Sequence, residues 1–395
     1  MSFYLDNSAT TPLHDEITSY LKEILNVFGN PSSSHSKGVY SKQLIEEVRK
    51  KTVRFINANL SDDIIFTSSA SASNTLGIQG YALFNVCTIL YPKTLHKSAL
   101  KTIEVLSKYY HIGTSILDVD CYGNINIEFL KQEMQKGYTQ KLVVLDYANS
   151  EIGTIQNVKE IVKIVHQYNG KVFVDCTGSI SSIPLDVSGL NIDMASFSAH
   201  KIGALKGVGV LYKKEDIKLS SLIHGTQEQG LFAGTENILG ILSLGKAIDL
   251  INYDSLDKML YNRNFVWDKL KNIDDVYLIG APLKQSRLLN NLFICIKGTV
   301  GSELVAMMDD MFDTQISTGS ACDNGSLTPS SVLLAIGTCK DDVNSCIRIS
   351  FSGKETEEEL AKFCENLHTC IKMIRDFFPD RFCESVHPIG ENYKI

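Results

Sequence analysis

The stretch Ser-Phe-Ser-Ala-His-Lys at residues 196–201 places a hydroxyl, an imidazole and an amine directly behind a short apolar run. Asp175 lies 26 residues before Lys201 and closes the run Lys-Val-Phe-Val-Asp at 171–175. An apolar, β-branched run that ends in an acid is typical of a buried parallel strand that delivers one side chain to the rim of a sheet. These two segments therefore predict a parallel sheet with a site at its carboxyl edge.

The residue types at this edge suit pyridoxal phosphate. A lysine such as Lys201 can hold the cofactor's aldehyde as a Schiff base, and a carboxylate such as Asp175 can keep the pyridine nitrogen protonated. Alone, neither residue is decisive, because a lysine after a strand is commonly a solvated surface residue and a strand-end aspartate often caps a helix. The rest of the chain has to distinguish these possibilities.

Length and composition indicate an ordinary globular protein with more than one domain. The chain has 395 residues, of which 44% are apolar and 21% charged, with a formal net charge of −7. This charge gives no argument for a nucleic-acid or anionic membrane partner. The first residues carry neither a basic segment nor an apolar one, and no apolar run approaches membrane-spanning length. We therefore expect a cytoplasmic protein with no membrane and no direct nucleic-acid partner.

Ten cysteines are scattered without C-x-x-C pairs, so we expect free thiols and no metal site. Cys322 differs from the others because it lies in the small, polar, glycine-containing sequence Ser-Thr-Gly-Ser-Ala-Cys-Asp-Asn-Gly-Ser at 317–326. Such a sequence predicts a mobile loop at about 317–328. A structural cysteine prefers apolar neighbours, so this context favours a nucleophile over an inert thiol.

Strands and helices alternate through most of the chain. Expected strands lie at 64–67, 88–90, 114–117, 142–147, 171–174, 194–197 and 208–212. The pattern predicts the α/β class, with a mainly parallel seven-stranded sheet covered by helices. The polar residues that follow these strands can converge at one edge of the sheet; they are Ser69, Ser71, His96, Asn149, Asp175, Ser198 and Lys201.

Ser71 and His96 each begin a helix after a strand. The hydroxyl of Ser71, with the free N–H groups of its helix, can hold a phosphate, and a simple N-cap is compatible with that role. His96 can stack on a planar cofactor ring, although an isolated histidine there is more commonly a hydrogen-bonded structural residue.

The last part of the chain predicts a smaller α+β unit. Strands are expected at 292–296 and 346–351, and helices at 302–311 and 355–378. We therefore expect a large cofactor-binding domain at 13–255. Residues 1–12 together with 256–395 are expected to form a small domain that carries the cysteine loop.

With these residues laid out, the chain resembles the cysteine desulfurases over essentially its whole length. This NifS/IscS-like group belongs to the class V aminotransferases, which are pyridoxal phosphate enzymes of fold type I. Matching segments follow one another in family order at 5–12, 29–32, 96–97, 151–153, 174–177, 197–201, 234–237, 317–322 and 347–350.

The resemblance implies a homodimer that uses pyridoxal 5'-phosphate to convert L-cysteine to L-alanine. It implies that Cys322 attacks the substrate sulfur and passes it, as a persulfide, to an acceptor such as an iron–sulfur scaffold or a tRNA-thiolation protein. Lys201 would bind the cofactor covalently and shuttle protons. Asp175 would pair with the pyridinium, and His96 would stack on the ring and assist proton transfer.

The resemblance also implies the binding residues. Those expected at the cofactor's phosphate are Ala70, Ser71, Ser198, His200 and, from the partner subunit, Thr235. Ser150 would face the phenolic oxygen. Arg348 would clamp the substrate carboxylate with its planar fork, with Asn30 nearby.

The chain departs from the family pattern at several positions. Gly178 stands where glutamine is usual, Ser150 where asparagine is usual, and Gln229 and Phe232 stand where basic residues are expected. Two alternatives therefore stay open: a selenocysteine lyase or other pyridoxal phosphate enzyme of the same fold, and a degenerate paralogue that binds a partner without catalysis.

Overall fold

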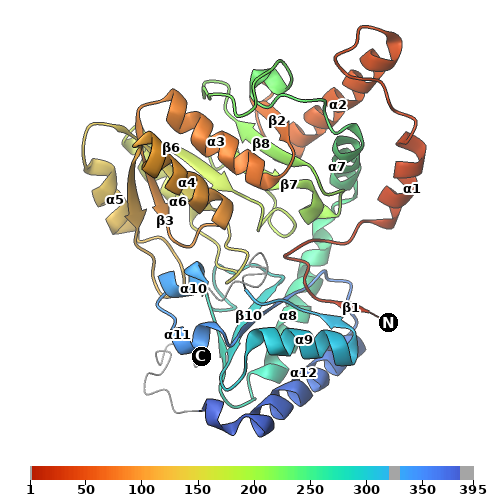
Figure 1. The fold of residues 1–395 in the computed structure, drawn as a ribbon, viewed down its shortest axis with the longest axis vertical. Helices are drawn as coiled ribbons and strands as arrows, with labels where there is room; N and C mark the ends of the chain where they lie inside the picture. Colours follow the sequence, from red (N-terminus) through yellow and green to blue (C-terminus); the bar gives the residue numbers. More distant parts are fainter. Residues whose placement is uncertain (1, 320–329, 383–395) are drawn as a thin grey trace.

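The computed structural model describes residues 2–319 and 330–382. Figure 1 shows two bodies, an upper one that holds the large sheet and a lower one that holds a smaller sheet. The large sheet has seven strands in the order β2-β8-β7-β6-β5-β3-β4. Their bounds are β2 Asp63–Thr67, β3 Cys87–Pro92, β4 Gly113–Leu117, β5 Gln140–Asp146, β6 Lys171–Asp175, β7 Met194–Ser198 and β8 Gly209–Lys213.

The prediction of a mainly parallel seven-stranded sheet is confirmed. The pairs β3–β4, β3–β5, β5–β6 and β6–β7 are parallel, whereas β8 runs antiparallel to both β7 and β2. The parallel strands β3 to β7 therefore end at one edge, and the same edge receives the start of β8. This edge gathers the loops in which the candidate residues lie.

Helices cover both faces of this sheet. In β5, Leu142 and Val144 belong to one core while Val143 and Leu145 belong to another, because successive strand residues point to opposite faces. Helices α3 (Ala70–Phe84) and α4 (Lys97–Tyr110) pack on the first core. The second core is covered by α1 (Asp15–Ile24), α2 (Ser36–Phe55), α5 (Ile127–Gln135), α6 (Val158–Gln167) and α7 (Ile238–Leu250).

The lower body combines the chain from α8 onward with its first residues. An antiparallel sheet has the order β12-β10-β9, and a two-stranded parallel sheet joins β1 to β11. The bounds are β1 Phe3–Tyr4, β9 Val276–Leu278, β10 Asn291–Ile296, β11 Thr314–Gln315, β12 Cys346–Ser350, α8 Leu256–Leu270, α9 Gly301–Phe312, α10 Ser331–Ala335, α11 Lys340–Val343 and α12 Glu357–Phe377. Leu5 is fully buried in the core of this body. The N-terminal segment is thereby tied to residues more than 250 positions away.

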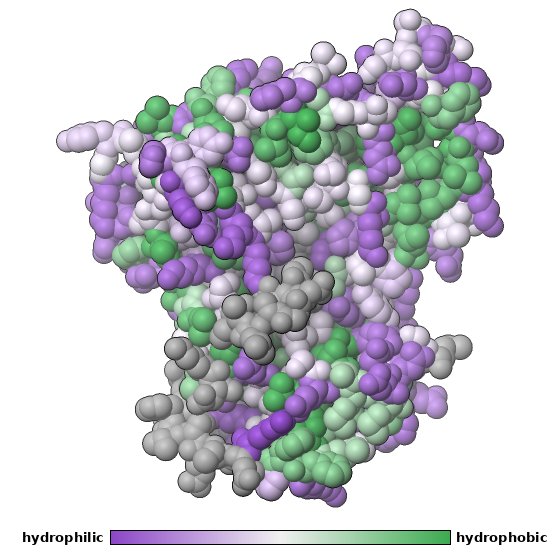
Figure 2. All heavy atoms as spheres, viewed as in Figure 1, coloured by the Kyte–Doolittle hydropathy of each residue, from purple (hydrophilic) through white to green (hydrophobic). Residues whose placement is uncertain are grey.

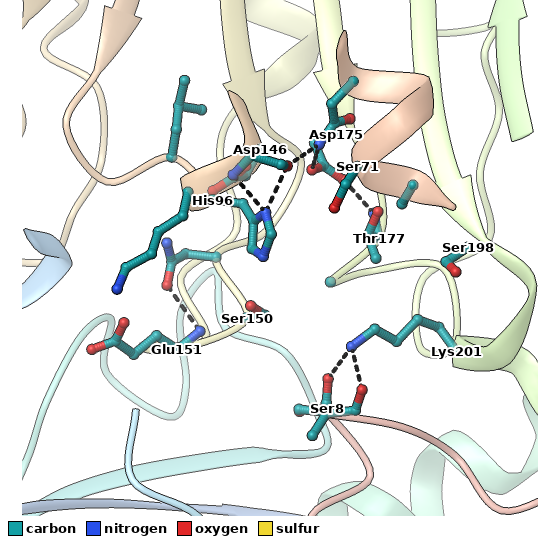
Figure 3. Close-up of a pocket in the computed structure, with 18 of the residues that line it drawn as sticks. Ser8, Ser71, His96, Asp146, Ser150, Glu151, Asp175, Thr177, Ser198 and Lys201 are labelled. Atoms are coloured by element: carbon teal, nitrogen blue, oxygen red, sulfur yellow. Dashed lines mark hydrogen bonds between the residues drawn. The ribbon is translucent and has the colours of Figure 1, made fainter. Parts of the chain in front are cut away.

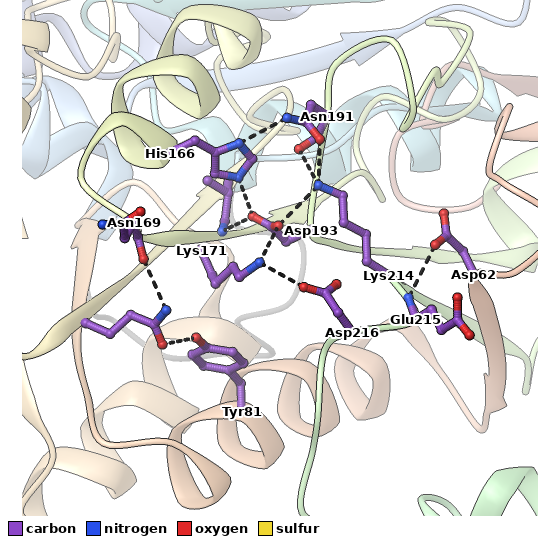
Figure 4. A network of polar contacts seen from close by, with 12 residues as sticks. Asp62, Tyr81, His166, Asn169, Lys171, Asn191, Asp193, Lys214, Glu215 and Asp216 are labelled. Atoms are coloured by element: carbon purple, nitrogen blue, oxygen red, sulfur yellow. Dashed lines mark hydrogen bonds and ion pairs between the residues drawn. The ribbon is translucent and has the colours of Figure 1, made fainter.

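At the opposite edge of the large sheet, a buried carboxylate ties several strand ends together (Figure 4). Asp193 accepts hydrogen bonds from His166 Nε2 at 2.7 Å, Val172 N at 2.9 Å, Lys214 Nζ at 3.2 Å and Lys171 Nζ at 3.3 Å. Burial alone would raise the pKa of Asp193, but these partners hold it below its usual value. The four donors to Asp193 lie on α6, on β6 and directly after β8. We therefore interpret this cluster as structural.

Candidate active site

A cavity of about 510 Å³ opens where the carboxyl edge of the large sheet faces the lower body (Figure 3). The predicted residues that line it are Ala70, Ser71, His96, Ser150, Asp175, Ser198, His200, Lys201 and Arg348. They come from the loops after β2, β3, β5, β6 and β7 and from β12 of the lower body. The structure therefore brings together side chains that lie far apart in the sequence.

Asp175 ends β6 and is held rigidly. Its Oδ2 accepts a hydrogen bond from Asn74 Nδ2 at 2.7 Å, and its Oδ1 accepts one from Thr177 N at 2.9 Å. The residue is only 4% exposed. These two hydrogen bonds fix the orientation of the carboxyl group at the cavity, which Asp175 lines.

His96 is the N-cap of α4. Its Nδ1 accepts a hydrogen bond from Ser98 N at 3.2 Å and lies 2.8 Å from Ser98 Oγ. Because Nδ1 accepts from a backbone N–H, the proton of the neutral ring lies on Nε2. The ring is therefore held in one tautomer at the cavity wall (Figure 3).

Lys201 lies in a short 3-10 helix, η1 (Ala199–Ile202), directly after β7. Its Nζ donates hydrogen bonds to the carbonyl oxygens of Ser8 and of Ala9, the latter at 2.9 Å. Thr11 Oγ1 donates to the carbonyl oxygen of Lys201 at 3.0 Å. The amine is thus directed into the cavity, toward the N-terminal segment that closes it (Figure 3).

The start of α3 forms an anion-binding corner. The helix begins at Ala70, with Ser69 as its N-cap, so that Ser71 lies in the first turn. Ser69 Oγ accepts a hydrogen bond from Ala72 N at 3.2 Å. The positive end of the helix dipole, the hydroxyls of Ser71 and Ser198 and the amine of Lys206 all line this part of the cavity.

His200 contributes to this corner without a charge. Its Nδ1 lies 3.0 Å from Thr10 Oγ1. Burial, followed by the nearby amines of Lys201 and Lys206, lowers the pKa of His200 to about 4. The imidazole is therefore neutral at physiological pH.

Arg348 reaches the cavity from β12 with part of its hydrogen-bonding capacity unused. Its Nη1 donates to the carbonyl oxygen of Ser150 at 3.1 Å, and its Nη2 donates to Asp6 Oδ1 at 2.9 Å. Its Nε is shielded from solvent and has no hydrogen-bond partner among the described residues. A buried unpaired donor on a guanidinium suits an anionic ligand.

Two predicted residues lie away from this cavity. Asn30 is exposed in the loop between α1 and α2, where its Oδ1 accepts from Ser32 N at 2.9 Å. Thr235 is exposed before α7. Neither is among the residues that line the cavity in this single chain.

Cys322 lies outside the described residues, but both flanks of its segment are described. Gly319 and Ser330 each line the cavity. Ser330 Oγ donates a hydrogen bond to Glu151 Oε1, and Ser317 pairs with Arg348 through backbone hydrogen bonds of 2.6 and 3.2 Å. The residues on both sides of the segment that carries the predicted nucleophile therefore lie at the cavity.

Several cavity residues were missed from the sequence. Asn74, Asp146, Glu151 and Ser8 line the cavity but were not predicted as site residues. Asp146 could have been found, because it ends an apolar strand as Asp175 does. Asn74 lies within a helix, and its position became evident only from the packing of α3 on the sheet.

The donor set fits pyridoxal phosphate. A lysine amine, a rigid strand-end carboxylate, a histidine ring and a helix N-terminus with hydroxyls surround one cavity, and these are the groups that an aldehyde, a pyridine nitrogen, an aromatic ring and a phosphate require. In the described part of the chain, no cluster of three or more His, Cys, Asp or Glu side chains could hold a metal ion. No helix within residues 2–319 and 330–382 is long and apolar enough to cross a membrane.

Comparison with known families agrees with this geometry. The family model for aminotransferase class-V matches residues 3–363. The chain therefore belongs to the aminotransferase class-V family.

Curated relatives and solved structures narrow the class further. The cysteine desulfurase IscS of Dictyoglomus turgidum is 36% identical over 388 residues, which are 95% of this chain and 96% of the relative. A solved NifS-like protein superposes with a TM-score of 0.86 at 29% identity and covers 94% of this chain and 100% of its own. The structure of SspA in complex with cysteine has a TM-score of 0.76 at 26% identity, covering 90% of this chain and 100% of that one. Within its family, the chain thus groups with the cysteine desulfurases.

Proposed function

We propose that this protein is a pyridoxal phosphate-dependent cysteine desulfurase that converts L-cysteine to L-alanine and transfers the sulfur to Cys322 as a persulfide. The observation that carries the proposal is that Lys201, Asp175 and Arg348 line one cavity, and that the two described flanks of the Cys322 segment line it too. The 36% identity to a cysteine desulfurase over 95% of the chain supports the same reaction.

The cofactor's parts have matching residues. When bound, pyridoxal phosphate supplies an electron sink for the carbanion that forms at the substrate Cα. Asp175 would hold a proton at the pyridine nitrogen, and His96 would pack against the ring. The first turn of α3, which includes Ser71, would hold the phosphate together with Ser198 at the end of β7.

Lys201 has two roles in this proposal. Its Nζ would hold the cofactor's aldehyde when substrate is absent, and it would move a proton to and from the substrate Cα when substrate is present. In the cofactor-free protein, the amine donates hydrogen bonds to the carbonyl oxygens of Ser8 and Ala9.

Arg348, which lines the cavity, would bind the substrate carboxylate. The thiolate of Cys322 then attacks the substrate sulfur. An S–S bond forms, the C–S bond of the substrate breaks, and the remaining three-carbon product takes up a proton to become L-alanine. The persulfide passes to an acceptor protein, such as an iron–sulfur scaffold or a tRNA-thiolation protein, in the cytoplasm.

A homodimer is part of the proposal. Exposed apolar side chains lie on α2 and in the loop between α1 and α2: Leu25 is 63% exposed, Phe28 75%, Val39 42% and Tyr40 53%. Figure 2 shows apolar residues gathered over this side of the upper body. Contiguous exposed apolar surface of this kind is typical of an interface between subunits, and Asn30 lies on the same loop as Phe28. The measurement is the mass in solution by light scattering, where a monomer would contradict the dimer.

The activity is tested by incubating the purified protein, loaded with pyridoxal phosphate, with L-cysteine and assaying alanine and sulfide together. We expect a yellow protein that forms the two products in equal amounts in the presence of a thiol reductant. Product from L-selenocysteine alone would instead identify a lyase. A colourless protein without product would indicate a paralogue that has lost catalysis.

A further inference from the structure

A second aspartate lies beside the one that faces the cofactor. Asp146 ends β5 and Asp175 ends β6, and the two residues are direct partners in the parallel register of these strands. Both line the cavity. Neighbouring strands are about 4.8 Å apart, so two carboxyl groups stand side by side at the floor of the site, with His96 next to them (Figure 3).

The two carboxyl groups differ in their partners. Both oxygens of Asp175 accept hydrogen bonds, from Asn74 and from Thr177 N. In contrast, Oδ1 of Asp146 is shielded from solvent and has no hydrogen-bond partner among the described residues. Both oxygens of Asp175 are thus engaged, whereas one oxygen of Asp146 has no partner among the described residues and can carry a proton.

The groups that face Asp146 come from three elements. They are Asp175 on β6, Cys176 directly after it, the His96 side chain and backbone N–H at the start of α4, and the amide of Asn149. Burial, followed by the charge of Asp175, raises the pKa of Asp146 well above its usual value, and His96 opposes the rise only in part. Two adjacent carboxyl groups resist joint ionisation, as in the catalytic pairs of aspartic proteases.

We propose that Asp146 is a second ionisable residue of the cofactor site, which holds a proton in the empty cavity and releases it when a protonated pyridine ring binds beside Asp175. The inference rests on the proposed cofactor. The positive charge that pairs with Asp175 also favours the ionised form of Asp146, so the carboxyl proton leaves for solvent as the cation arrives. Asp146 then contributes a second negative charge to the pyridinium.

This coupling makes cofactor affinity depend on pH. Asp146 has one pKa in the cofactor-free protein and a lower one when the pyridinium is bound. Between these two values, the cofactor-free site holds one proton more than the occupied site. Affinity for the pyridinium form therefore rises with pH in that interval, by up to about tenfold per pH unit for one proton released. Outside the interval Asp146 adds no pH dependence.

The test uses calorimetric titration of 4'-deoxypyridoxine 5'-phosphate into the cofactor-free protein. This probe keeps the pyridine nitrogen and the phosphate but has no aldehyde, so it does not react with Lys201. Titrations in two buffers of different ionisation enthalpy give the protons released per probe bound. Asp146→Asn preserves the shape and removes the ionisation, and Asp118→Asn makes the same change at an exposed residue after β4 that does not line the cavity.

Across the pH range in which Asp146 is protonated in the cofactor-free protein, we expect the wild type and Asp118→Asn to release up to one proton more than Asp146→Asn. Proton exchange by the probe itself cancels in this difference. Equal proton counts in all three proteins would overturn the inference. Equal counts together with normal binding would leave the proposed function standing, so the two failures are distinguishable.

A second measurement does not need any ligand. In the cofactor-free protein, a carboxyl whose pKa is raised on folding makes the folded state lose stability as pH rises above its unfolded value of about 3.9. The Tm of Asp146→Asn minus that of the wild type should therefore increase as pH rises above about 4. Parallel Tm profiles would contradict a proton on Asp146 even if the probe fails to bind, and failure of the probe to bind would overturn the cofactor site itself.

Discussion

Arg348 Nη2 donates a hydrogen bond of 2.9 Å to Oδ1 of Asp6, across 342 positions of sequence. The same carboxylate oxygen accepts a hydrogen bond of 2.9 Å from Ser317 Oγ, at the start of the segment that leads to Cys322. Asp6 therefore connects the arginine expected to bind substrate with the chain that carries the expected nucleophile. It also fixes the orientation of the guanidinium at the cavity.

Replacing Arg348 with lysine should weaken substrate binding more than it slows turnover. Lysine keeps the charge but loses the planar fork that can pair with Asp6 and a carboxylate together. A hydrogen bond to a charged group contributes about 1.5–3 kcal/mol, so we expect KM for L-cysteine to rise by about 10- to 100-fold. Arg375→Lys is the control, since Arg375 on α12 donates to the carbonyl oxygens of Lys297 and Asp274 and does not line the cavity. An unchanged KM for Arg348→Lys would contradict the assignment.

Replacing Lys201 with alanine should abolish covalent attachment of the cofactor while leaving phosphate-dependent binding. Borohydride reduction of the loaded wild type, followed by peptide mapping, should place the pyridoxyl group on Lys201 alone. Lys97 and Lys206 also line the cavity. A label on either of these lysines would show that the wrong amine has been assigned.

Cys322→Ser should retain cofactor binding and the spectral response to L-cysteine but lose persulfide and sulfide. A hydroxyl is far less nucleophilic toward sulfur than a thiolate. Cys121→Ser is a matched control, because Cys121 is exposed and does not line the cavity. Sulfide release by Cys322→Ser at the wild-type rate would exclude Cys322 as the acceptor.

The sequence predicted the large sheet well because its strands are apolar runs that end in turns. All seven expected strands are present, with bounds shifted by one or two residues, such as Gln140–Asp146 where 142–147 was predicted. Missed elements are short or lack periodicity: β1 and β11 have two residues each, and β9 has three. Helix α5 (Ile127–Gln135) was also missed, although four of its nine residues are apolar, because so short an amphipathic run is a weak signal.

The site was predictable where a residue type and a strand end coincide, as for Asp175, His96 and Lys201. It was not predictable where position depends on tertiary contacts. Glu151 lies in a family motif, but its role as acceptor for Ser330 Oγ, 179 positions away, follows only from the docking of the lower body. Asp6 and Arg348 are a second case, because nothing local in either segment indicates the other.

The low pKa of His200 predicts a pH dependence of stability. The folded-state pKa is about 4, and the unfolded value is about 6.5. Between these values the unfolded state binds more protons, so the cofactor-free protein should gain stability as pH rises from about 4 to 6.5 and then show no further change from this group. His200→Asn should flatten the Tm profile in that interval, whereas His368→Asn, at an exposed position on α12, should not. Identical profiles for wild type and His200→Asn would contradict the neutral, buried imidazole.

The last prediction concerns Ser150 and Gly178, the two departures from the family pattern at positions expected to face the cofactor's phenolic oxygen. A donor aimed at this oxygen stabilises its anionic form and lowers the pKa of the bound chromophore. Restoring glutamine at 178 is not a clean test, because a Cβ there would lie 2.7 Å from the carbonyl oxygen of Ala148 and 3.2 Å from Ser150 Cβ. The backbone at residues 148–150 would have to shift, at a cost of about 1–3 kcal/mol.

Ser150→Asn therefore offers the better restoration. We expect it to lower the pKa of the visible absorbance by about one unit, since a charged hydrogen bond of about 1.5–3 kcal/mol corresponds to one or two pKa units. Gly178→Ala separates the steric effect from the donor, because it adds the Cβ and no donor: it should lower the Tm and leave the visible titration unchanged. The measurements are a pH titration of the visible band and a thermal melt for each variant. Coincident titration curves for wild type and Ser150→Asn would mean that another group already donates to the phenolic oxygen. An unchanged Tm in Gly178→Ala would show that the backbone at 148–150 can shift without loss of stability.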